Sequence, residues 1–330
     1  MTLLQSEFRE FDKAIRLGWK DEQAILRDKR DTILERIRER IDGPSFSAFN
    51  QGSYEIGTGV KPVDGDHDID VGLRFNTTKE EWPDPVKLKE RVAEALSGYD
   101  VKLRRPCVTV QYSRNKEPKY HVDLNVYVPV PGDATMLYLA IGKVGDAASL
   151  KDWRYTDPLA LSRAIDEKFT GDDRDQFRRV VRYLKRWKDL AFSREGNAAP
   201  KGIGLTAAAL KWFSVAKELD RVANVEHYAD LSALSGLVAS MRANAFPRLV
   251  VTLPVPPHDD LFRRMNDEQM KVFRSKLGAL DDGLRSALGD ADDASTSSTL
   301  RNYLGEDFPE VKKSAARRVG AAIVSSGAAG

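Results

Sequence analysis

Two segments with alternating polar and apolar residues constrain the fold most. Residues 68–73 read Asp-Ile-Asp-Val-Gly-Leu, and residues 121–128 read His-Val-Asp-Leu-Asn-Val-Tyr-Val. Alternation with a period of two is typical of a β-strand that buries one face. Both segments therefore predict strands whose apolar residues enter a core. If the two strands are neighbours, Asp123 lies beside Asp68 and Asp70 on the opposite face.

Three carboxylates this close need a counter-charge, because like charges repel and raise each other's pKa. Magnesium prefers oxygen ligands and shares its coordination shell with substrate phosphates. Two such ions, roughly 3.5–4 Å apart, can hold both an attacking hydroxyl and a leaving pyrophosphate. Asp68, Asp70 and Asp123 are therefore predicted to be catalytic and to bind two Mg²⁺ ions, with Mn²⁺ as the alternative metal.

A small-residue pair, Gly52-Ser53, precedes Asp68 by about fifteen residues. Glycine lets the backbone approach a ligand closely, and a serine hydroxyl with nearby N–H groups can bind phosphate oxygens. Gly-Ser alone carries no information, and Asp-x-Asp alone carries little. Their order, followed by an aspartate on a later strand, favours transfer of a nucleotidyl group.

Two other interpretations of the acidic segment were weighed. Asp64, Asp66, Asp68 and Asp70 have the spacing of a calcium-binding EF-hand loop, but that loop needs Gly at its sixth position and Glu at its twelfth. This chain has neither. A solvated acidic turn accounts for the first two aspartates, but not for the alternation that begins at Asp68.

The order Gly-Ser, Asp-x-Asp, Asp resembles that of the DNA-polymerase-β-like nucleotidyltransferases. The fuller string from Gln51 to Val71, with Gly57-Thr58 and Lys61-Pro62, resembles the bacterial cGAS/DncV-like nucleotidyltransferases (CD-NTases). The resemblance is densest over residues 45–130 and extends more weakly to about 215. It implies an α+β, bilobed nucleotidyltransferase fold, with a mixed β-sheet catalytic lobe and a helical lobe.

The same resemblance implies substrates and further site residues. ATP and GTP are the expected substrates, and Gln51, Gly52 and Ser53 are expected to contact them. In the family, a lysine in the helix that corresponds to residues 174–188 contacts the donor triphosphate, and a hydroxyl at the start of the next helix joins it. Lys185 and Thr206 occupy these places, although the family often has Ser at the second. The other basic residues of that segment are predicted to lie on a solvated helix face.

Composition excludes several classes of protein. The 330 residues carry 52 basic and 50 acidic side chains, so no global charge attracts nucleic acid. The single cysteine excludes an internal disulfide framework. No signal-peptide pattern and no long apolar run is present, so we expect a cytoplasmic protein without a membrane span. The four histidines are scattered, so a zinc finger, and with it direct DNA sensing, is not expected.

The chain divides into a strand-rich and a helix-rich part, predicted at 1–155 and 156–330. A long helix over residues 2–41 is expected to form a spine. The expected strands are near 45–51, 67–75, 99–104, 106–113, 119–130 and 136–142, with a helix near 85–97 and a hairpin tip at Asn115-Lys116. The expected later helices are near 157–169, 172–191, 204–219, 228–243 and 259–287, with a mobile loop at 289–299.

The leading functional prediction is synthesis of a cyclic oligonucleotide from purine nucleoside triphosphates in anti-phage defence (CBASS), with a cyclic trinucleotide of adenine and guanine as the favoured product. Transfer to tRNA or an antibiotic, and a catalytically silent nucleotide-binding regulator, are the alternatives. The resemblance also implies a HORMA-type or E1/E2-like regulator as partner. The small-residue end 325–330 suggests Gly330 as a conjugation site, or a tail without a role.

Overall fold

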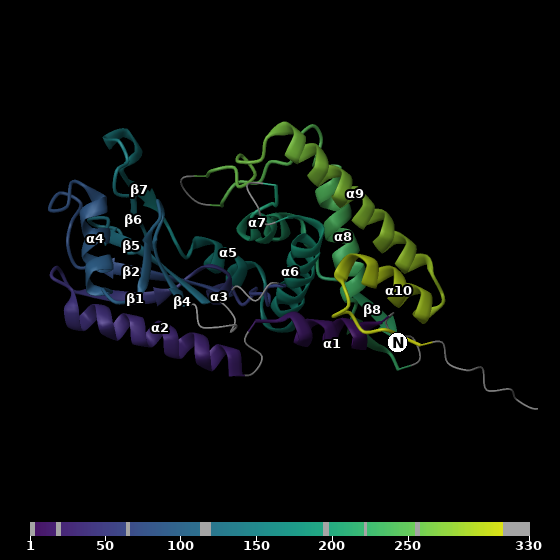
Figure 1. The fold of residues 1–330 in the computed structure, drawn as a ribbon. Coiled ribbons are helices and arrows are strands. Elements are labelled where there is room, and N and C mark those ends of the chain that lie inside the picture. The colour runs from purple at the N-terminus through teal and green to yellow at the C-terminus, as the bar shows by residue number, and fades with distance from the viewer. Residues whose placement is uncertain are drawn as a thin grey trace, which may run out of the picture.

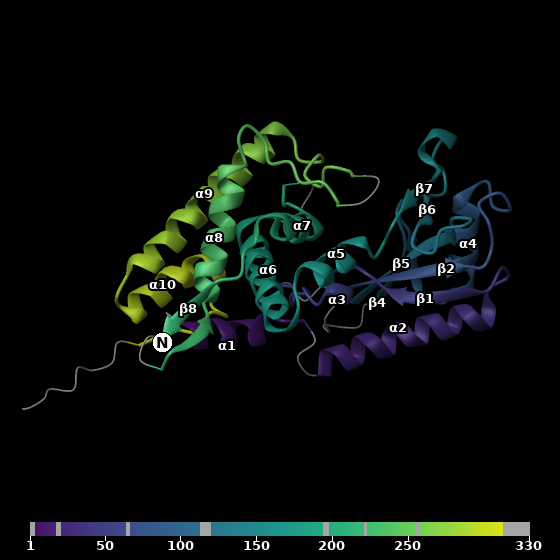
Figure 2. The ribbon, with the colours of Figure 1, turned by 180° about the vertical axis from the view of Figure 1, so that it is seen from behind.

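The computed structural model describes residues 4–17, 21–63, 67–112, 120–193, 198–220, 223–254 and 258–312. These residues form two lobes that lie side by side in both views (Figure 1, Figure 2). One lobe is built on a β-sheet and the other is mainly helical. The predicted α+β, bilobed architecture is confirmed. Asn115-Lys116 and Gly330 lie outside the described residues.

The sheet lobe contains a seven-stranded mixed sheet. Its strands are β1 (Phe46–Asn50), β2 (His67–Phe75), β3 (Asp100–Leu103), β4 (Val108–Tyr112), β5 (Tyr120–Pro129), β6 (Leu137–Ile141) and β7 (Asp152–Thr156). Strands β2 and β5 are parallel neighbours, and the other pairs are antiparallel. The predicted pairing of the two carboxylate-bearing strands is confirmed. Strand β7 was not predicted.

The alternation in β2 and β5 separates a core face from a polar face. Ile69, Val71, Val122 and Leu124 are fully buried, and α2 (Asp21–Arg40) and α4 (Pro85–Ala95) pack on this side. The intervening polar side chains remain on the other side of the sheet, so the sequence period places the carboxylates away from the core.

The helical lobe is built around α6 (Gly171–Ala191), whose apolar stripe is fully buried. Around it lie α1 (Gln5–Ile15), α5 (Ala160–Lys168), α7 (Gly202–Trp212), α8 (Asp230–Ala243), α9 (Asp267–Gly289) and α10 (Asp293–Leu304). A small hairpin, β8 (Lys217–Asp220) and β9 (Val225–Tyr228), completes the lobe. The short helices α3 (Gly52–Ile56) and η1 (Ala148–Leu150) belong to connections within the sheet lobe.

The prediction of one continuous helix over residues 2–41 is wrong. The chain leaves α1 at Arg16, whose backbone is extended and forms a bridge with Val60. Helix α1 buries Phe8 and Phe11 in the core of the helical lobe, whereas α2 buries Ile33 and its neighbours in the core of the sheet lobe. Figure 1 shows the two helices beneath different lobes. Helical periodicity alone does not reveal that the two halves serve different cores.

Three boundaries in the second half also differ from the prediction. The helix expected over 204–219 ends at Trp212, and β8 follows. The helix expected from 259 begins at Asp267, where Asn266 and Gln269 form a capping box. The expected mobile loop at 289–299 is largely α10, because the Asp292 carboxylate accepts a hydrogen bond from the Ala294 N–H (2.9 Å) and caps the helix.

Among the described residues, no helix combines the length and the apolar character needed to cross a membrane.

Candidate active site

The three predicted carboxylates converge. Asp70 and Asp123 are directly opposite in the parallel β2–β5 register, and Asp68 lies two residues before Asp70 on the same face. Oxygen atoms from all three lie within 4.8 Å of one another. The Thr109 hydroxyl donates to Asp123 Oδ1 at 2.5 Å and thereby fixes this carboxylate. Oxygen donors at this separation suit a hard divalent cation, so these residues fit a metal site.

The electrostatics of Asp70 support the same conclusion. Burial and, to a smaller extent, the neighbouring Asp123 raise the pKa of its carboxyl from 3.8 to about 6, against an opposing effect of Lys185. The charged form is therefore costly in the protein without metal, and a bound cation would remove that cost.

This cost predicts a measurable dependence of stability on pH. Because the folded pKa of Asp70 exceeds the unfolded value, its contribution to stability is complete below pH 3.8 and is lost as the pH rises through about 6. The whole effect corresponds to about 3 kcal/mol. The variant Asp70→Asn does not ionise and should therefore become more stable than the wild type as the pH rises.

Urea unfolding with a chelator, at pH 5 and pH 7.5, measures this difference. The advantage of Asp70→Asn should grow by about 1 kcal/mol or more between the two pH values, since the substitution removes the ionisation of Asp70 itself. If the stability advantage of Asp70→Asn is the same at both pH values, the assigned cost of ionising Asp70 in the folded protein is wrong. Added magnesium should stabilise the wild type more than the variant.

The Gly-Ser pair forms a turn against the carboxylates rather than an open loop. The turn comprises residues 51–58 and includes α3. Gly52 has a φ of +66°, and a Cβ there would lie 2.2 Å from Asp70 Oδ2. Only glycine meets both conditions. Gln51 is buried, its N–H donates to the Asp70 carbonyl (3.2 Å), and its Oε1 accepts from the Tyr127 hydroxyl (2.9 Å). Gln51 thus supports the turn from the sheet.

A cleft of about 820 Å³ lies in front of the carboxylates and extends to the helical lobe. Its lining includes all eight predicted site residues, namely Gln51, Gly52, Ser53, Asp68, Asp70, Asp123, Lys185 and Thr206. The volume is within the range of about 300–1,000 Å³ that is common for ligand sites. The structure therefore brings all eight candidates together around one cleft.

Lys185 reaches the cleft from α6. Burial, with smaller contributions from Lys188 and Arg182, lowers the pKa of its ammonium group to about 7. Its Nζ donates to the carbonyl and to the hydroxyl of Thr58, both at 3.1 Å. Thr206 is buried, and its hydroxyl donates to the Gly202 carbonyl at 3.0 Å, within its own helix.

Sequence reasoning did not single out several other polar residues of the cleft. Lys188, Lys201 and Arg104 line it and add positive charge near the carboxylates. Lys201 comes directly before α7, which the prediction started at Gly204 rather than at Gly202. A predicted helix that began at Gly202 would have drawn attention to Lys201, the residue directly before it.

The expectation that the other basic residues of α6 are solvated is wrong for three of the six. Arg179, Arg182 and Arg186 are almost fully buried. Arg179 pairs with Asp230 of α8 (2.6 Å), and Arg182 pairs with Asp12 of α1 (2.6 Å). Their partners come from distant parts of the sequence, so local periodicity could not identify them.

Comparison with known proteins identifies the domain. Residues 46–127 match the family model described as the nucleotidyltransferase domain of cyclic GMP-AMP synthase DncV-like proteins. The chain is 27% identical over 180 residues to a cyclic GMP-AMP synthase of Escherichia albertii. That match covers 51% of this chain but only 38% of the relative.

Solved structures share the fold over most of the chain. The CD-NTase CdnG of Bradyrhizobium diazoefficiens, in complex with GTP, superposes with a TM-score of 0.68 at 16% identity, covering 92% of this chain and 95% of CdnG. CdnC of E. coli MS115-1, in a complex named CdnC:HORMA-deltaN, gives 0.66 at 15% identity, covering 92% of this chain and 98% of CdnC.

Carboxylates on two adjacent parallel strands, with a Gly-Ser turn above them, define a nucleotidyltransferase domain. The family match over residues 46–127 and the shared fold confirm the resemblance to the bacterial cGAS/DncV-like nucleotidyltransferases, the CD-NTases, that the motifs predicted.

Proposed function

We propose that this protein is a magnesium-dependent enzyme that joins purine nucleoside triphosphates into a cyclic oligonucleotide for bacterial anti-phage signalling. One observation carries the proposal: the oxygens of Asp68, Asp70 and Asp123 lie within 4.8 Å of one another in a cleft that Lys185 also lines. Negative ligands for metal ions and a positive group for a triphosphate thus share one cavity. The favoured product is a cyclic trinucleotide of adenine and guanine.

The chemistry follows from these positions. A ribose hydroxyl of the acceptor forms a new bond to the α-phosphorus of the donor, and the bond from that phosphorus to pyrophosphate breaks. Asp123, whose carboxylate accepts a hydrogen bond from Thr109, would accept the hydroxyl proton. Two magnesium ions held by the three aspartates would neutralise the charge of the phosphates. Ser53 and Lys185 would hold the donor triphosphate. Repetition of this transfer within one chain of nucleotides closes the ring.

Three similar proteins support the product class, the substrate and the partner, respectively. The Escherichia albertii relative is a cyclic GMP-AMP synthase, CdnG was solved with GTP, and CdnC was solved with a HORMA protein. A HORMA-type regulator is accordingly a proposed partner here. Conjugation through Gly330 by an E1/E2-like protein is a separate proposal that rests only on the residues 325–330.

Incubation of the protein with labelled ATP and GTP and with magnesium, followed by phosphatase, tests the function. A phosphatase-resistant product supports cyclisation, and its mass gives the ring size. If the label is transferred only to added tRNA or aminoglycoside, that molecule is the acceptor and no cyclic product is made. Nucleotide binding without any product would instead indicate a silent regulator.

The role of Lys185 gives a second prediction. Lys185→Ala should raise the KM for the donor triphosphate by about tenfold, which corresponds to ~1.4 kcal/mol, because a charge-assisted contact to phosphate is lost. Steady-state kinetics measures the change. The control is Arg174→Ala on the same helix, since Arg174 pairs with Asp166 at 2.8 Å and does not line the cleft. Equal effects of the two substitutions would remove Lys185 from the triphosphate site.

A further inference from the structure

Helix α6 places a row of basic side chains along residues 56–58, the end of the turn 51–58. Arg178, Arg182 and Lys185 are four and then three residues apart, so they share one helix face. Arg178 Nε donates to the Ile56 carbonyl (2.8 Å), Arg182 Nη1 to the Gly57 carbonyl (2.5 Å) and Lys185 Nζ to the Thr58 carbonyl (3.1 Å). Successive turns of the helix thus contact successive carbonyl groups.

These carbonyl groups belong to the segment that closes the turn over the carboxylates. The Thr58 N–H donates to the Ser53 carbonyl at 2.9 Å, and the Gly57 N–H donates to the Tyr54 carbonyl at 3.3 Å. A movement of residues 56–58 is therefore transmitted to Ser53 and to Gly52, where an added Cβ would collide with the Asp70 carboxylate.

The turn is attached to both lobes. On the sheet side, the Gln51 N–H donates to the Asp70 carbonyl. On the helical side, Arg182 also pairs with Asp12 of α1, and the Lys61 N–H donates to the Ile15 carbonyl at the end of α1 (2.7 Å). Residues 51–61 therefore connect the carboxylate site to the helical lobe.

The contacts are specific in geometry. Gly57 has a φ of +77°, and a Cβ there would lie 3.2 Å from Arg178 Nε, so glycine leaves room for the guanidinium to reach the carbonyl of Ile56. A buried arginine is costly unless its donors are satisfied in fixed directions. Apolar packing would join the lobes at a lower cost, but it would not set the direction of individual carbonyl groups.

We propose that Arg178 and Arg182 are positioning residues, which set the turn 51–58 from the helical lobe so that Ser53 and the three carboxylates meet the same triphosphate. The proposal rests on the proposed function. It adds that the geometry of the phosphate-binding turn depends on the position of α6. Neither arginine touches the substrate in this assignment. Arg178 is the better residue for a test, because Arg182→Ala would leave Asp12 without its buried partner.

The first experiment is hydrogen exchange of the whole protein followed by mass spectrometry. Arg178→Ala should accelerate exchange in peptides that cover residues 51–58 by about tenfold, because a hydrogen bond from a charged donor is lost. Exchange in α9 should not change. Arg174→Ala is the control on the same helix, and Arg178→Lys, which retains a donor, should recover part of the protection.

The second experiment is kinetic. Arg178→Ala should lower kcat/KM for nucleotide joining by about tenfold relative to Arg174→Ala, and Arg178→Lys should restore part of it. Unchanged exchange in 51–58 would overturn the proposal, and so would faster exchange with kcat/KM equal to that of the control. If the wild type makes no product, the proposed function fails. The exchange measurement alone then decides whether Arg178 holds the turn.

Discussion

The double variant Asp68→Asn, Asp70→Asn is expected to lose nucleotidyl transfer by a factor of at least about 1,000, or ~4 kcal/mol of transition-state stabilisation. The substitutions remove two negative charges from the metal site and change the side-chain volume little. Product formation from labelled triphosphates, with magnesium in excess, measures the loss.

The matched control is Asp100→Asn, because Asp100 is an exposed residue on β3 of the same sheet and does not line the cleft. The control should retain the wild-type rate. Both proteins should unfold cooperatively. Synthesis by the double variant at near the wild-type rate would refute the assignment of these aspartates to the metal site.

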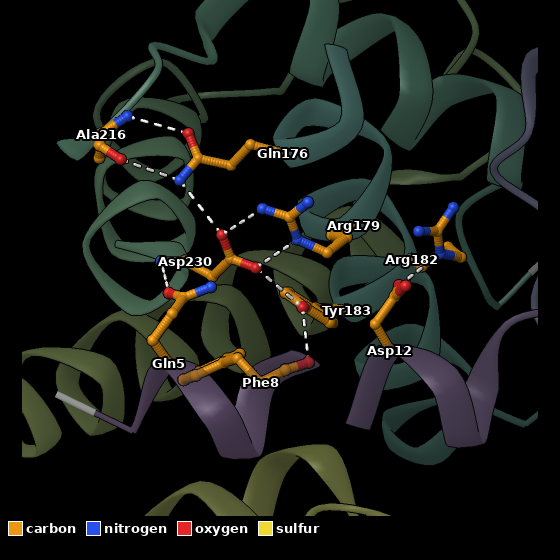
Figure 3. A network of polar contacts seen from close by, with 9 residues as sticks. All are labelled: Gln5, Phe8, Asp12, Gln176, Arg179, Arg182, Tyr183, Ala216 and Asp230. Atoms are coloured by element: carbon orange, nitrogen blue, oxygen red, sulfur yellow. Dashed lines mark hydrogen bonds and ion pairs between the residues drawn. The ribbon is translucent and has the colours of Figure 1, made fainter. Parts of the chain in front are cut away.

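The second large effect concerns stability. Arg179→Ala should lower the free energy of unfolding by about 3–5 kcal/mol, because it leaves the Asp230 carboxylate buried without its cation. Figure 3 shows Asp230 between Arg179, Gln176 and Tyr183, three residues of α6. The guanidinium donates to both oxygens of Asp230, at 2.6 and 2.9 Å.

Denaturant unfolding measures this loss, with the half-buried Arg174→Ala as the control on the same helix. The double variant Arg179→Met, Asp230→Asn should recover part of the stability, because no unpaired charge is then buried. A loss of less than about 1 kcal/mol for Arg179→Ala would show that water or another cation replaces the guanidinium.

The sheet and its carboxylates were predictable because both depend on local periodicity. In β2 the apolar residues Ile69, Val71 and Leu73 alternate with polar ones, and the predicted strand 67–75 matches the observed one. The same rule placed Asp123 on the polar face of β5. Chemistry then restricted the function, because three aspartates on one face have few uses other than metal binding.

The boundaries of the helical lobe were less predictable because caps and distant contacts determine them. Residues 293–299 are small and polar, but Thr296 and Ser297 are fully buried in α10. Ser297 donates to the Pro309 carbonyl at 2.7 Å, so its hydroxyl is satisfied by a residue beyond the helix. Composition alone indicated a mobile loop.

The sequence by itself determined the class of site: a period of two fixed the strand faces, and Gly52 permitted the turn against Asp70. Only the tertiary structure decided the roles of the basic residues on α6. A local pattern cannot distinguish a solvated arginine from one that pairs with Asp12 or Asp230, because those partners lie about 50 to 170 residues away. Both pairs lie within the helical lobe, where α6 meets α1 and α8, and a charge is buried only where folding supplies its partner.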